Sequence, residues 1–286
     1  MRIERQRIEI DGQTVAWAGG GEGPAVVLLH GTLTSLNDPL MALGPALVQA
    51  GFRVIAFDRP GNGESTRLPG EASMWGQAER LRDAARRLEL KQPVLVGHSQ
   101  GGSIATAWAL AHPEEVAGVV AVAPIVVPEP RLELLIFGPR APWGAGDLLS
   151  YAAMPLDGLL LPLLWRGMFL PQAMPAAFRA TYPVDEAGER ARLRAVAEET
   201  AHLVSDLGRL TASAAGCRVP VRVLQGDRDP VVNLLHGRTL AALAPDSSFT
   251  MLSGLGHMAD HFAQKQVIAA VREIADPGQT RGCAAA

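Results

Sequence analysis

The pentapeptide Gly97-His98-Ser99-Gln100-Gly101 constrains the fold more than any other stretch of this chain. It follows the apolar run Val94–Val96 and precedes a helix-like stretch, Gly101–Ala111. Glycines two residues before and after the serine let a strand and a helix meet at a very sharp turn, because neither carries a side chain that would keep them apart. The serine hydroxyl would then project at the start of the helix, whose free N–H groups favour an oxyanion. The pattern predicts a nucleophile at Ser99, provided that its catalytic partners follow downstream.

Short apolar runs alternate with helix-like stretches along most of the chain. Continuously apolar runs are typical of strands that are covered on both faces of a parallel sheet. The predicted strands are 25–29, 53–57, 94–96, 116–123, 221–225 and 248–252, and the predicted helices are 41–50, 72–90, 101–111, 234–243 and 258–274. Before them, runs 7–10 and 14–18 flank Asp11-Gly12, which is typical of a two-residue hairpin turn. The alternation predicts an α/β fold with a mostly parallel eight-stranded sheet and helices on both faces.

The alternation stops between residues 124 and 216, where prolines are frequent. We expect short helices there, forming a lid inserted into a core of residues 1–123 and 217–275, with a flexible tail at 276–286. The apolar run Leu159–Phe169 is interrupted and is well short of the roughly 20 residues that cross a bilayer, so no membrane-spanning segment is predicted. The side chains expected to contact an apolar substrate are Leu33, Trp143, Trp165, Met168 and Phe169. Alternatively, the aromatic side chains of this segment only attach the lid to the sheet.

Composition narrows the class of partner to a small molecule. A net charge of −3 and a pI near 6.2 give no reason to expect nucleic acid or an anionic membrane. The two cysteines, Cys217 and Cys283, suggest neither a disulfide framework nor a thiolate metal site. The glycine-rich turn 19–24 lacks the spacing of a dinucleotide-binding loop, so no cofactor is predicted and no metal site is expected. The N-terminus lacks the apolar region of a secretory signal, which makes the cytoplasm the expected location.

The partners that a nucleophilic serine requires follow it in the chain. A serine hydroxyl needs an imidazole base, and the imidazole needs an acid that fixes its tautomer. Asp229 follows one predicted strand and His257 follows the last one, which gives the order Ser, Asp, His. Asp227 is an alternative acid. His261 is an alternative base, although its place one helical turn beyond His257 favours a surface role.

Four motifs in this order resemble those of the α/β-hydrolase fold superfamily, in its lidded serine esterase branch. They extend from about residue 25 to residue 262, and they are His30-Gly31-Thr32, Asp58-Arg59-Pro60-Gly61-Asn62-Gly63-Glu64-Ser65, Gly97-His98-Ser99-Gln100-Gly101-Gly102, and Gly226-x-x-Asp229 with Gly256-His257. The resemblance implies that Ser99 is the nucleophile, Asp229 the acid and His257 the base. It also implies an oxyanion hole made by the backbone N–H groups of Thr32 and Gln100. We expect His98 to pack beneath the turn and His30 to shape the oxyanion loop.

The identity of the residue at the turn bears on the reaction. Dehalogenases and epoxide hydrolases of this fold carry an aspartate there, whereas a serine points to acyl transfer. The resemblance therefore implies a cofactor-free hydrolase of a carboxylic ester or lactone with an apolar acyl or alcohol part. The alternatives are hydrolysis of a carbon–carbon bond in a ketone or diketone by the same triad, and a non-catalytic ligand receptor on this scaffold.

Overall fold

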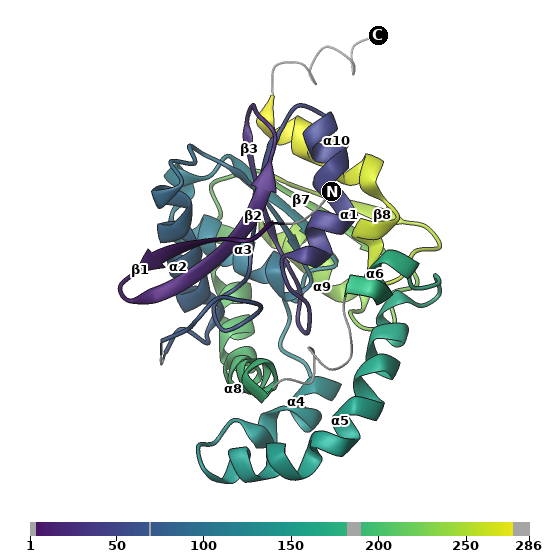
Figure 1. The fold of residues 1–286 in the computed structure, drawn as a ribbon. Helices are drawn as coiled ribbons and strands as arrows, with labels where there is room; N and C mark the ends of the chain where they lie inside the picture. Colours follow the sequence, from purple (N-terminus) through teal and green to yellow (C-terminus); the bar gives the residue numbers. More distant parts are fainter. Residues whose placement is uncertain (1–3, 69, 182–189, 277–286) are drawn as a thin grey trace.

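The computed structural model describes residues 4–68, 70–181 and 190–276. Within them, eight strands form one sheet in the order β1-β2-β4-β3-β5-β6-β7-β8 (Figure 1). The strands are β1 (Gln6–Ile10), β2 (Gln13–Gly20), β3 (Ala25–Leu29), β4 (Arg53–Phe57), β5 (Val94–His98), β6 (Gly118–Val122), β7 (Val221–Gly226) and β8 (Ser247–Leu252). The pairs β1–β2 and β2–β4 are antiparallel, and the remaining pairs are parallel. The predicted mostly parallel sheet of eight strands is confirmed.

The hairpin that opens the sheet follows from its two turn residues. Asp11 and Gly12 have φ angles of 51° and 74°, and Ile10 pairs directly with Gln13. Positive φ at both central positions is the type I′ geometry, whose twist matches that of the flanking strands.

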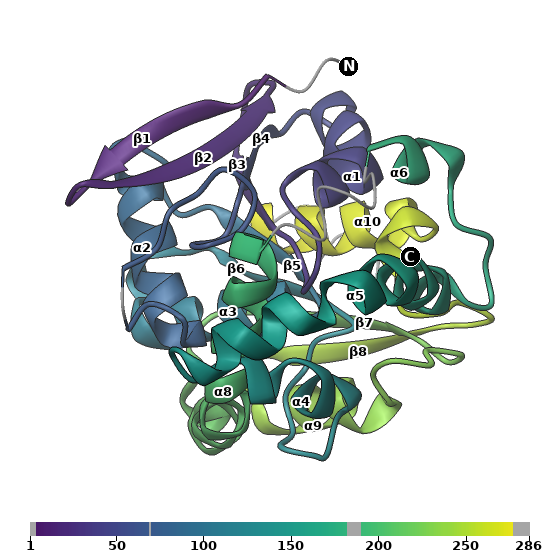
Figure 2. The ribbon, with the colours of Figure 1, turned by 60° about the horizontal axis from the view of Figure 1, so that its bottom comes forward.

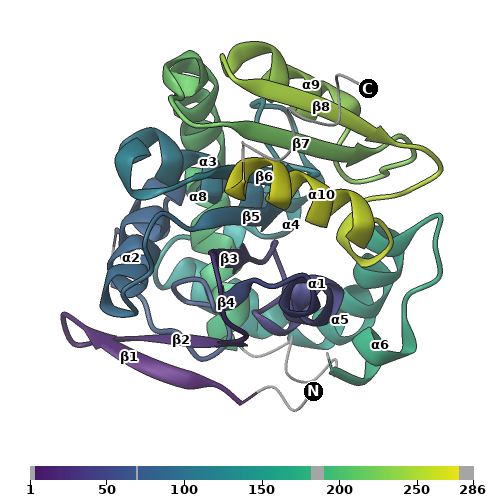
Figure 3. The ribbon, with the colours of Figure 1, turned by 90° about the horizontal axis from the view of Figure 1, so that it is seen from above.

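Helices cover both faces of the sheet (Figure 3). Successive strand residues point to opposite faces, so Val27 and Leu29 join one core, whereas Val26 and Leu28 join the other. A continuously apolar strand is the consequence of this two-sided burial. The first core is covered by α2 (Met74–Arg87), α3 (Gln100–Ala111) and α9 (Leu234–Leu243), and the second by α1 (Asn37–Gln49) and α10 (Gln264–Ala275).

Two helices begin at positions that the sequence pattern does not indicate. Helix α1 begins at Asn37 rather than near residue 41, and the backbone N–H of Leu36 before it donates to the Asp58 carboxylate at 2.8 Å. The closing helix was expected from residue 258, but the chain first makes the 3₁₀ turn η4 (Ala259–His261) and α10 starts only at Gln264. At α1, a contact with a distant part of the chain thus accompanies the earlier start of the helix.

Between β6 and β7 the chain leaves the sheet, and we call residues 124–216 the helical segment. Its elements gather at one end of the sheet (Figures 1 and 2). They are α4 (Leu132–Ile136), η2 (Gly138–Arg140), α5 (Ala145–Phe169), α6 (Ala176–Thr181), α8 (Arg190–Ser213) and η3 (Ala214–Gly216). The expectation of short helices only is wrong, since α5 and α8 have 25 and 24 residues. The expected tail lies outside the described residues, apart from Asp276.

Prolines bend α5 instead of ending it. Pro155 and Pro162 lie inside the helix, and the arms Ala145–Ala153 and Pro155–Phe169 meet at 75°. A proline removes one helical hydrogen bond and clashes with the preceding turn, so a kink is the expected result where packing retains the helix. Among the described residues, no single helix is long and apolar enough to cross a membrane, although the two arms of α5 together have the length and composition to do so.

The helical segment has an apolar core of its own. Trp165 and Phe169 of α5 pack against Phe178 of α6, and the rings of Phe169 and Phe178 meet edge to face with centroids 4.8 Å apart. Met258, from the loop after β8, also joins this cluster. Through Met258, the core of the helical segment lies directly beside the edge of the sheet where the strands end.

Candidate active site

Ser99 stands at the sharp turn between β5 and α3. Its φ and ψ are 53° and −122°, a strained conformation for a residue with a side chain. A Cβ on Gly97 would lie 2.3 Å from the carbonyl oxygen of Gly101, and a Cβ on Gly101 would lie 2.3 Å from that of Leu29. Both glycines are therefore required for the close approach of the strand and the helix that holds Ser99 in this conformation.

Asp229 and His257 come together from the loops after β7 and β8. The His257 Nδ1–H donates to Asp229 Oδ2 at 2.9 Å, and both side chains are buried. Asp229 Oδ1 accepts the backbone N–H groups of Val231 and Val232 at 2.8 and 2.9 Å. Burial alone would raise the pKa of Asp229, but the interaction with His257 and the two N–H donors lower that pKa. The carboxylate is held ionised and fixes the orientation and tautomer of the imidazole.

The alternative acid, Asp227, faces elsewhere. Its side chain accepts the backbone N–H of Gly254 at 2.6 Å and so ties down the loop after β8. Of the two aspartates, it is Asp229 that contacts the ring of His257.

Ser99 and His257 line one cavity of about 450 Å³ between the sheet edge and the helical segment. Its wall on the side of the helical segment is mostly apolar and includes Ile136, Leu164 and Met168. Another part of the wall carries the charged side chains of Glu129, Arg131 and Glu133, in which Arg131 forms ion pairs with both glutamates. The cavity thus offers an apolar surface beside the Ser99 hydroxyl and the His257 imidazole. It also contains the Arg131 cation, which is already paired with two glutamates.

Thr32 lines the same cavity as Ser99, and Gln100 follows Ser99 directly in the chain. Gln100 is the first residue of α3, so its backbone N–H has no acceptor within the helix. The Thr32 hydroxyl donates to the Gln100 side-chain carbonyl at 2.6 Å, which ties the loop after β3 to the start of α3. This bond holds the two backbones from which the predicted oxyanion donors come.

His30 and His98 are buried beneath the site. His30 Nε2 accepts the backbone N–H of Arg59 at 3.0 Å, and its Nδ1–H donates to the Gly31 carbonyl at 2.8 Å. The His98 Nε2–H donates to the backbone carbonyl of His257 at 3.0 Å, and the two rings lie 4.7 Å apart. Burial, as the main cause, lowers the pKa of both residues, so both rings are neutral scaffolding groups.

The side chain of His261 is only 5% exposed, contrary to the surface role expected for it. Its Nε2 lies 2.8 Å from Asp38 Oδ1, and the ring of Phe169 covers it with centroids 5.3 Å apart. Burial would lower the pKa of His261, but the hydrogen bond with Asp38 and the charges of Asp260 and Asp38 raise it. The expectation failed because α1 and the helical segment, both distant in sequence, enclose this residue.

Two groups of side chains have ligand atoms close enough to share a metal ion. Within the described part of the chain, the candidate ligands lie within 4.8 Å of one another in each group, and the groups are Asp38, Asp260 and His261, and His112, Glu114 and Glu115. The pKa of His261 is raised, which favours its protonated form, and a proton on His261 would give the first group a positive charge without a metal ion.

The residues expected to contact substrate divide into two sets. Leu33 and Met168 line the cavity. Trp165 and Phe169 do not, because they share with Leu161 the face of α5 that turns into the aromatic core of the helical segment. Trp143 does not either: it is 80% exposed, and the Arg194 guanidinium lies 4.3 Å from its ring centroid. The prediction that these three aromatic residues line the site is therefore wrong.

A buried polar network, which the sequence analysis missed, ties the helical segment to the sheet. Arg59 Nη1–H donates to Gln77 at 2.7 Å and to Glu199 of α8 at 3.2 Å, and Nη2–H donates to the Gly31 carbonyl at 3.1 Å. Asn62 donates to the other oxygen of Glu199 at 2.8 Å. The network thereby reaches the carbonyl of the residue immediately before Thr32.

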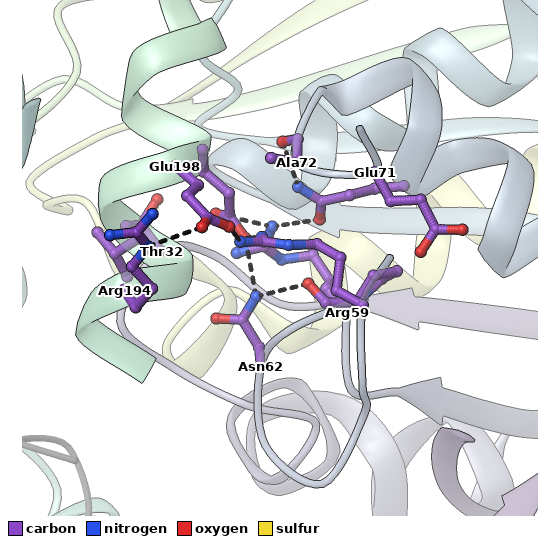
Figure 4. Close-up of polar contacts among 12 residues, drawn as sticks. Thr32, Arg59, Asn62, Glu71, Ala72, Arg194 and Glu198 are labelled. Carbon is purple, nitrogen blue, oxygen red and sulfur yellow. Dashed lines mark hydrogen bonds and ion pairs between the residues drawn. The ribbon is translucent and has the colours of Figure 1, made fainter. Parts of the chain in front are cut away.

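A second charged layer surrounds this network. Figure 4 shows Arg59 and Asn62 facing α8, which also carries Glu198 and Arg194. Arg67 forms an ion pair with Glu198, and Arg194 donates to the same glutamate at 2.7 Å. The loop motif after β4 was recognisable in the sequence, but its partners were not, because Glu199 is separated from Arg59 by 140 positions.

Comparison with known proteins agrees with the fold. A sequence profile described as "alpha/beta hydrolase fold" matches residues 24–262, which is most of the chain. The chain belongs to the α/β hydrolase family. Membership supports a hydrolase, and it leaves the bond that is cleaved to be argued from the site.

Individual relatives differ in activity. An uncharacterized protein of Mycobacterium tuberculosis (strain ATCC 25618 / H37Rv) is 26% identical over 276 residues, covering 93% of this chain and 80% of its own length. A 2-hydroxy-6-oxononadienedioate/2-hydroxy-6-oxononatrienedioate hydrolase of Comamonas testosteroni is 27% identical, covering 84% of this chain and 83% of its own. The crystal structure of a bacterial membrane phospholipase A superposes with a TM-score of 0.72 at 23% identity, covering 96% of this chain and 86% of that one. One of these proteins is thus named as a dienedioate hydrolase and another as a phospholipase A, so the matches agree on no single substrate.

Proposed function

We propose that this protein is a serine hydrolase that cleaves a carboxylic ester or lactone with an apolar acyl or alcohol part. One observation carries the proposal: Ser99, in its strained turn, lines the same cavity as His257, whose ring is held by the buried Asp229. Buried polar groups and a strained backbone conformation lower the stability of a fold, and both are concentrated at catalytic sites.

The proposed reaction proceeds through an acyl-enzyme. His257 Nε2 removes the proton of Ser99, whose Oγ attacks the carbonyl carbon, and the negative charge moves to the carbonyl oxygen. The backbone N–H groups of Thr32 and Gln100 donate to this oxyanion, each typically worth about 10² in rate or more. The tetrahedral intermediate then expels the alcohol, which takes the proton from His257. A water molecule activated in the same way releases the acid and regenerates Ser99.

The cavity argues for an apolar substrate of moderate size. A volume of about 450 Å³ is that of a small-ligand site, and its apolar wall favours an alkyl or ring substituent next to the ester. We therefore expect short to medium acyl chains to react fastest.

Carbon–carbon bond hydrolysis is the second candidate, because the Comamonas relative covers most of the chain and is named for a dienedioate substrate. The charges of the cavity weigh against a dicarboxylate substrate. Arg131, which lines the cavity, is engaged by Glu129 and Glu133, so it is not free to bind a carboxylate.

The test compares substrates on the full chain. Nitrophenyl esters of increasing chain length, lactones and β-diketones are assayed with the wild type and with Ser99→Ala. We expect ester or lactone hydrolysis with an optimum at short to medium chains, and its loss in Ser99→Ala. Cleavage of diketones without ester hydrolysis favours the second candidate. Ester hydrolysis that persists in Ser99→Ala contradicts the proposal.

A further inference from the structure

Helices α4 and α5 present leucine side chains to solvent beside the cavity. Single exposed leucines are ordinary, but a contiguous group of them marks an interaction surface. In α5, Leu156, Leu159 and Leu163 are three and four residues apart, which places them on one face of the helix. We call the group the apolar rim; its members are 54–77% exposed, and they are Leu132, Leu135, Leu156, Leu159, Leu163 and Leu170.

The rim is continuous with the candidate active site. Leu132, Leu163 and Leu170 are more than half exposed, and each also lines the cavity that contains Ser99. The same side chains thus meet solvent on one side and the cavity on the other. A molecule that covers the rim would deliver an apolar substrate directly into the cavity.

The charges around the rim favour a lipid headgroup layer. Arg166 lies between Leu163 and Leu170 on the exposed side of α5, and among the described residues it has no hydrogen bond or ion pair. By contrast, the two acidic residues of α5 are both engaged in ion pairs, Asp147 with Arg194 and Asp157 with Arg140. Among the described residues of α5, Arg166 is therefore a free cation, while both carboxylates are paired. An arginine among leucines suits an interface where the leucines enter the acyl layer and the guanidinium remains among phosphates.

A second copy of this chain suits the rim less well. A twofold contact through the rim would place two Arg166 cations in an apolar interface without acidic partners, which is costly. The net charge of −3 gave no reason to expect binding to an anionic membrane. A membrane, however, interacts with the charges on the face that lies against it, because salt screens electrostatic interactions within a Debye length of about 10 Å.

We propose that the apolar rim docks on the surface of an anionic phospholipid bilayer, from which an ester substrate enters the cavity past Leu132, Leu163 and Leu170. The docking step stands by itself, whereas the substrate step rests on the proposed function. The proposal deepens that function by naming a membrane-dissolved ester as the substrate class.

The test is flotation of the full chain with vesicles of phosphatidylcholine and phosphatidylglycerol. Leu156 and Leu159 do not line the cavity, so the double variant Leu156→Asp/Leu159→Asp changes the rim and not the site. We expect the wild type to float and the double variant to lose at least about tenfold in bound fraction, because charge is expelled from the acyl layer. The matched control is Leu235→Asp in α9, where the leucine is 55% exposed on a different element, and it should bind like the wild type.

Enzyme assays separate docking from catalysis. Hydrolysis of a water-soluble nitrophenyl butyrate should be unchanged in the double variant, while hydrolysis of an ester carried in the vesicles should fall about tenfold, in step with binding. Replacing phosphatidylglycerol by phosphatidylcholine should weaken the binding of the wild type to the vesicles. Arg166→Gln should remove this dependence of binding on the anionic lipid.

Three results overturn the proposal: a wild type that does not float, an equal loss of binding in Leu235→Asp, or a dimer that the double variant dissociates while neither protein binds vesicles. Flotation without hydrolysis of any ester supports docking and contradicts the proposed function instead. The two proposals therefore fail separately.

Discussion

The sheet edge and the helical segment differ in the kind of side chain that each buries or exposes. At the sheet edge, polar groups are buried and paired, as His257 is with Asp229 and His30 is with the backbone of Arg59. In the helical segment, by contrast, leucines such as Leu159 remain exposed on α5. Fixed polar geometry suits bond cleavage, and an adaptable apolar surface suits the capture of apolar molecules. Under the two proposals, the chemistry therefore belongs to the sheet edge and the supply of substrate to the helical segment.

The largest expected effect lies at the sheet edge. Asp229→Asn keeps the shape of the acid but removes the charge that fixes the tautomer of His257, so kcat should fall by about 10⁴. Asp227→Asn is the matched control and should change kcat little, since Asp227 bonds to Gly254. Steady-state kinetics on a soluble nitrophenyl ester measure both variants. A larger loss in Asp227→Asn would reverse the assignment of the acid.

The network that joins the two regions should contribute most to stability. Glu199→Gln leaves the buried Arg59 cation without a carboxylate, which should cost about 3–5 kcal/mol of unfolding free energy. Glu79→Gln removes a half-exposed glutamate that contacts His112, and it should cost at most about 1 kcal/mol. Urea unfolding followed by tryptophan fluorescence gives both values. Equal losses would show that the buried pair does not fasten the helical segment to the sheet.

The ion pair beneath the site should depend on pH. The folded pKa of His261 is raised above its ordinary value of 6.5, so its stabilisation is complete below pH 6.5 and is lost as the pH rises through the folded pKa. His261→Gln should therefore lower the unfolding free energy by about 1–3 kcal/mol near pH 6 and by less at higher pH. Urea unfolding of the wild type and of His261→Gln, from about pH 6 upward, measures this difference in unfolding free energy. A deficit that grows with pH would contradict the charge assigned to His261 beside Asp38 and Asp260.

The smallest effect is expected at Trp143. Its ring is exposed and contacts Arg194 rather than the cavity, so Trp143→Ala should leave KM unchanged and alter stability by at most about 1 kcal/mol. Met168→Ala shortens a side chain that lines the cavity and should raise KM about tenfold. Kinetics on a medium-chain ester distinguish the two. A raised KM in Trp143→Ala alone would restore the substrate contact expected from the sequence.

The core of the fold could be predicted because its signals are local. Continuous apolar runs identify strands that are covered on both faces, and the two glycines around Ser99 identify the sharp turn. The turn at Asp11-Gly12 likewise fixes the first hairpin through its positive φ angles. Each of these signals depends on a few neighbouring residues, and the structure follows them closely.

What could not be predicted depends on distant partners. The backbone N–H of Leu36, just before α1, donates to Asp58, and His261 is enclosed by α1 and α5. The prolines of α5 suggested several short helices, but the aromatic core beneath the helix retains one bent helix. Arg59 is polar and lies in a loop, and its complete burial becomes understandable only with Glu199 opposite it. Local patterns carry no information on which distant side chain will supply a charge.

Covalent labelling with a fluorophosphonate tests the central claim most directly. The reagent forms a stable phosphonyl ester with a serine whose hydroxyl is activated by a neighbouring base and whose oxyanion is stabilised. Peptide mass spectrometry should find one adduct, on Ser99, that is absent in Ser99→Ala and forms far more slowly in Asp229→Asn. A folded wild type that remains unlabelled, or an adduct that persists in Ser99→Ala, would contradict the account.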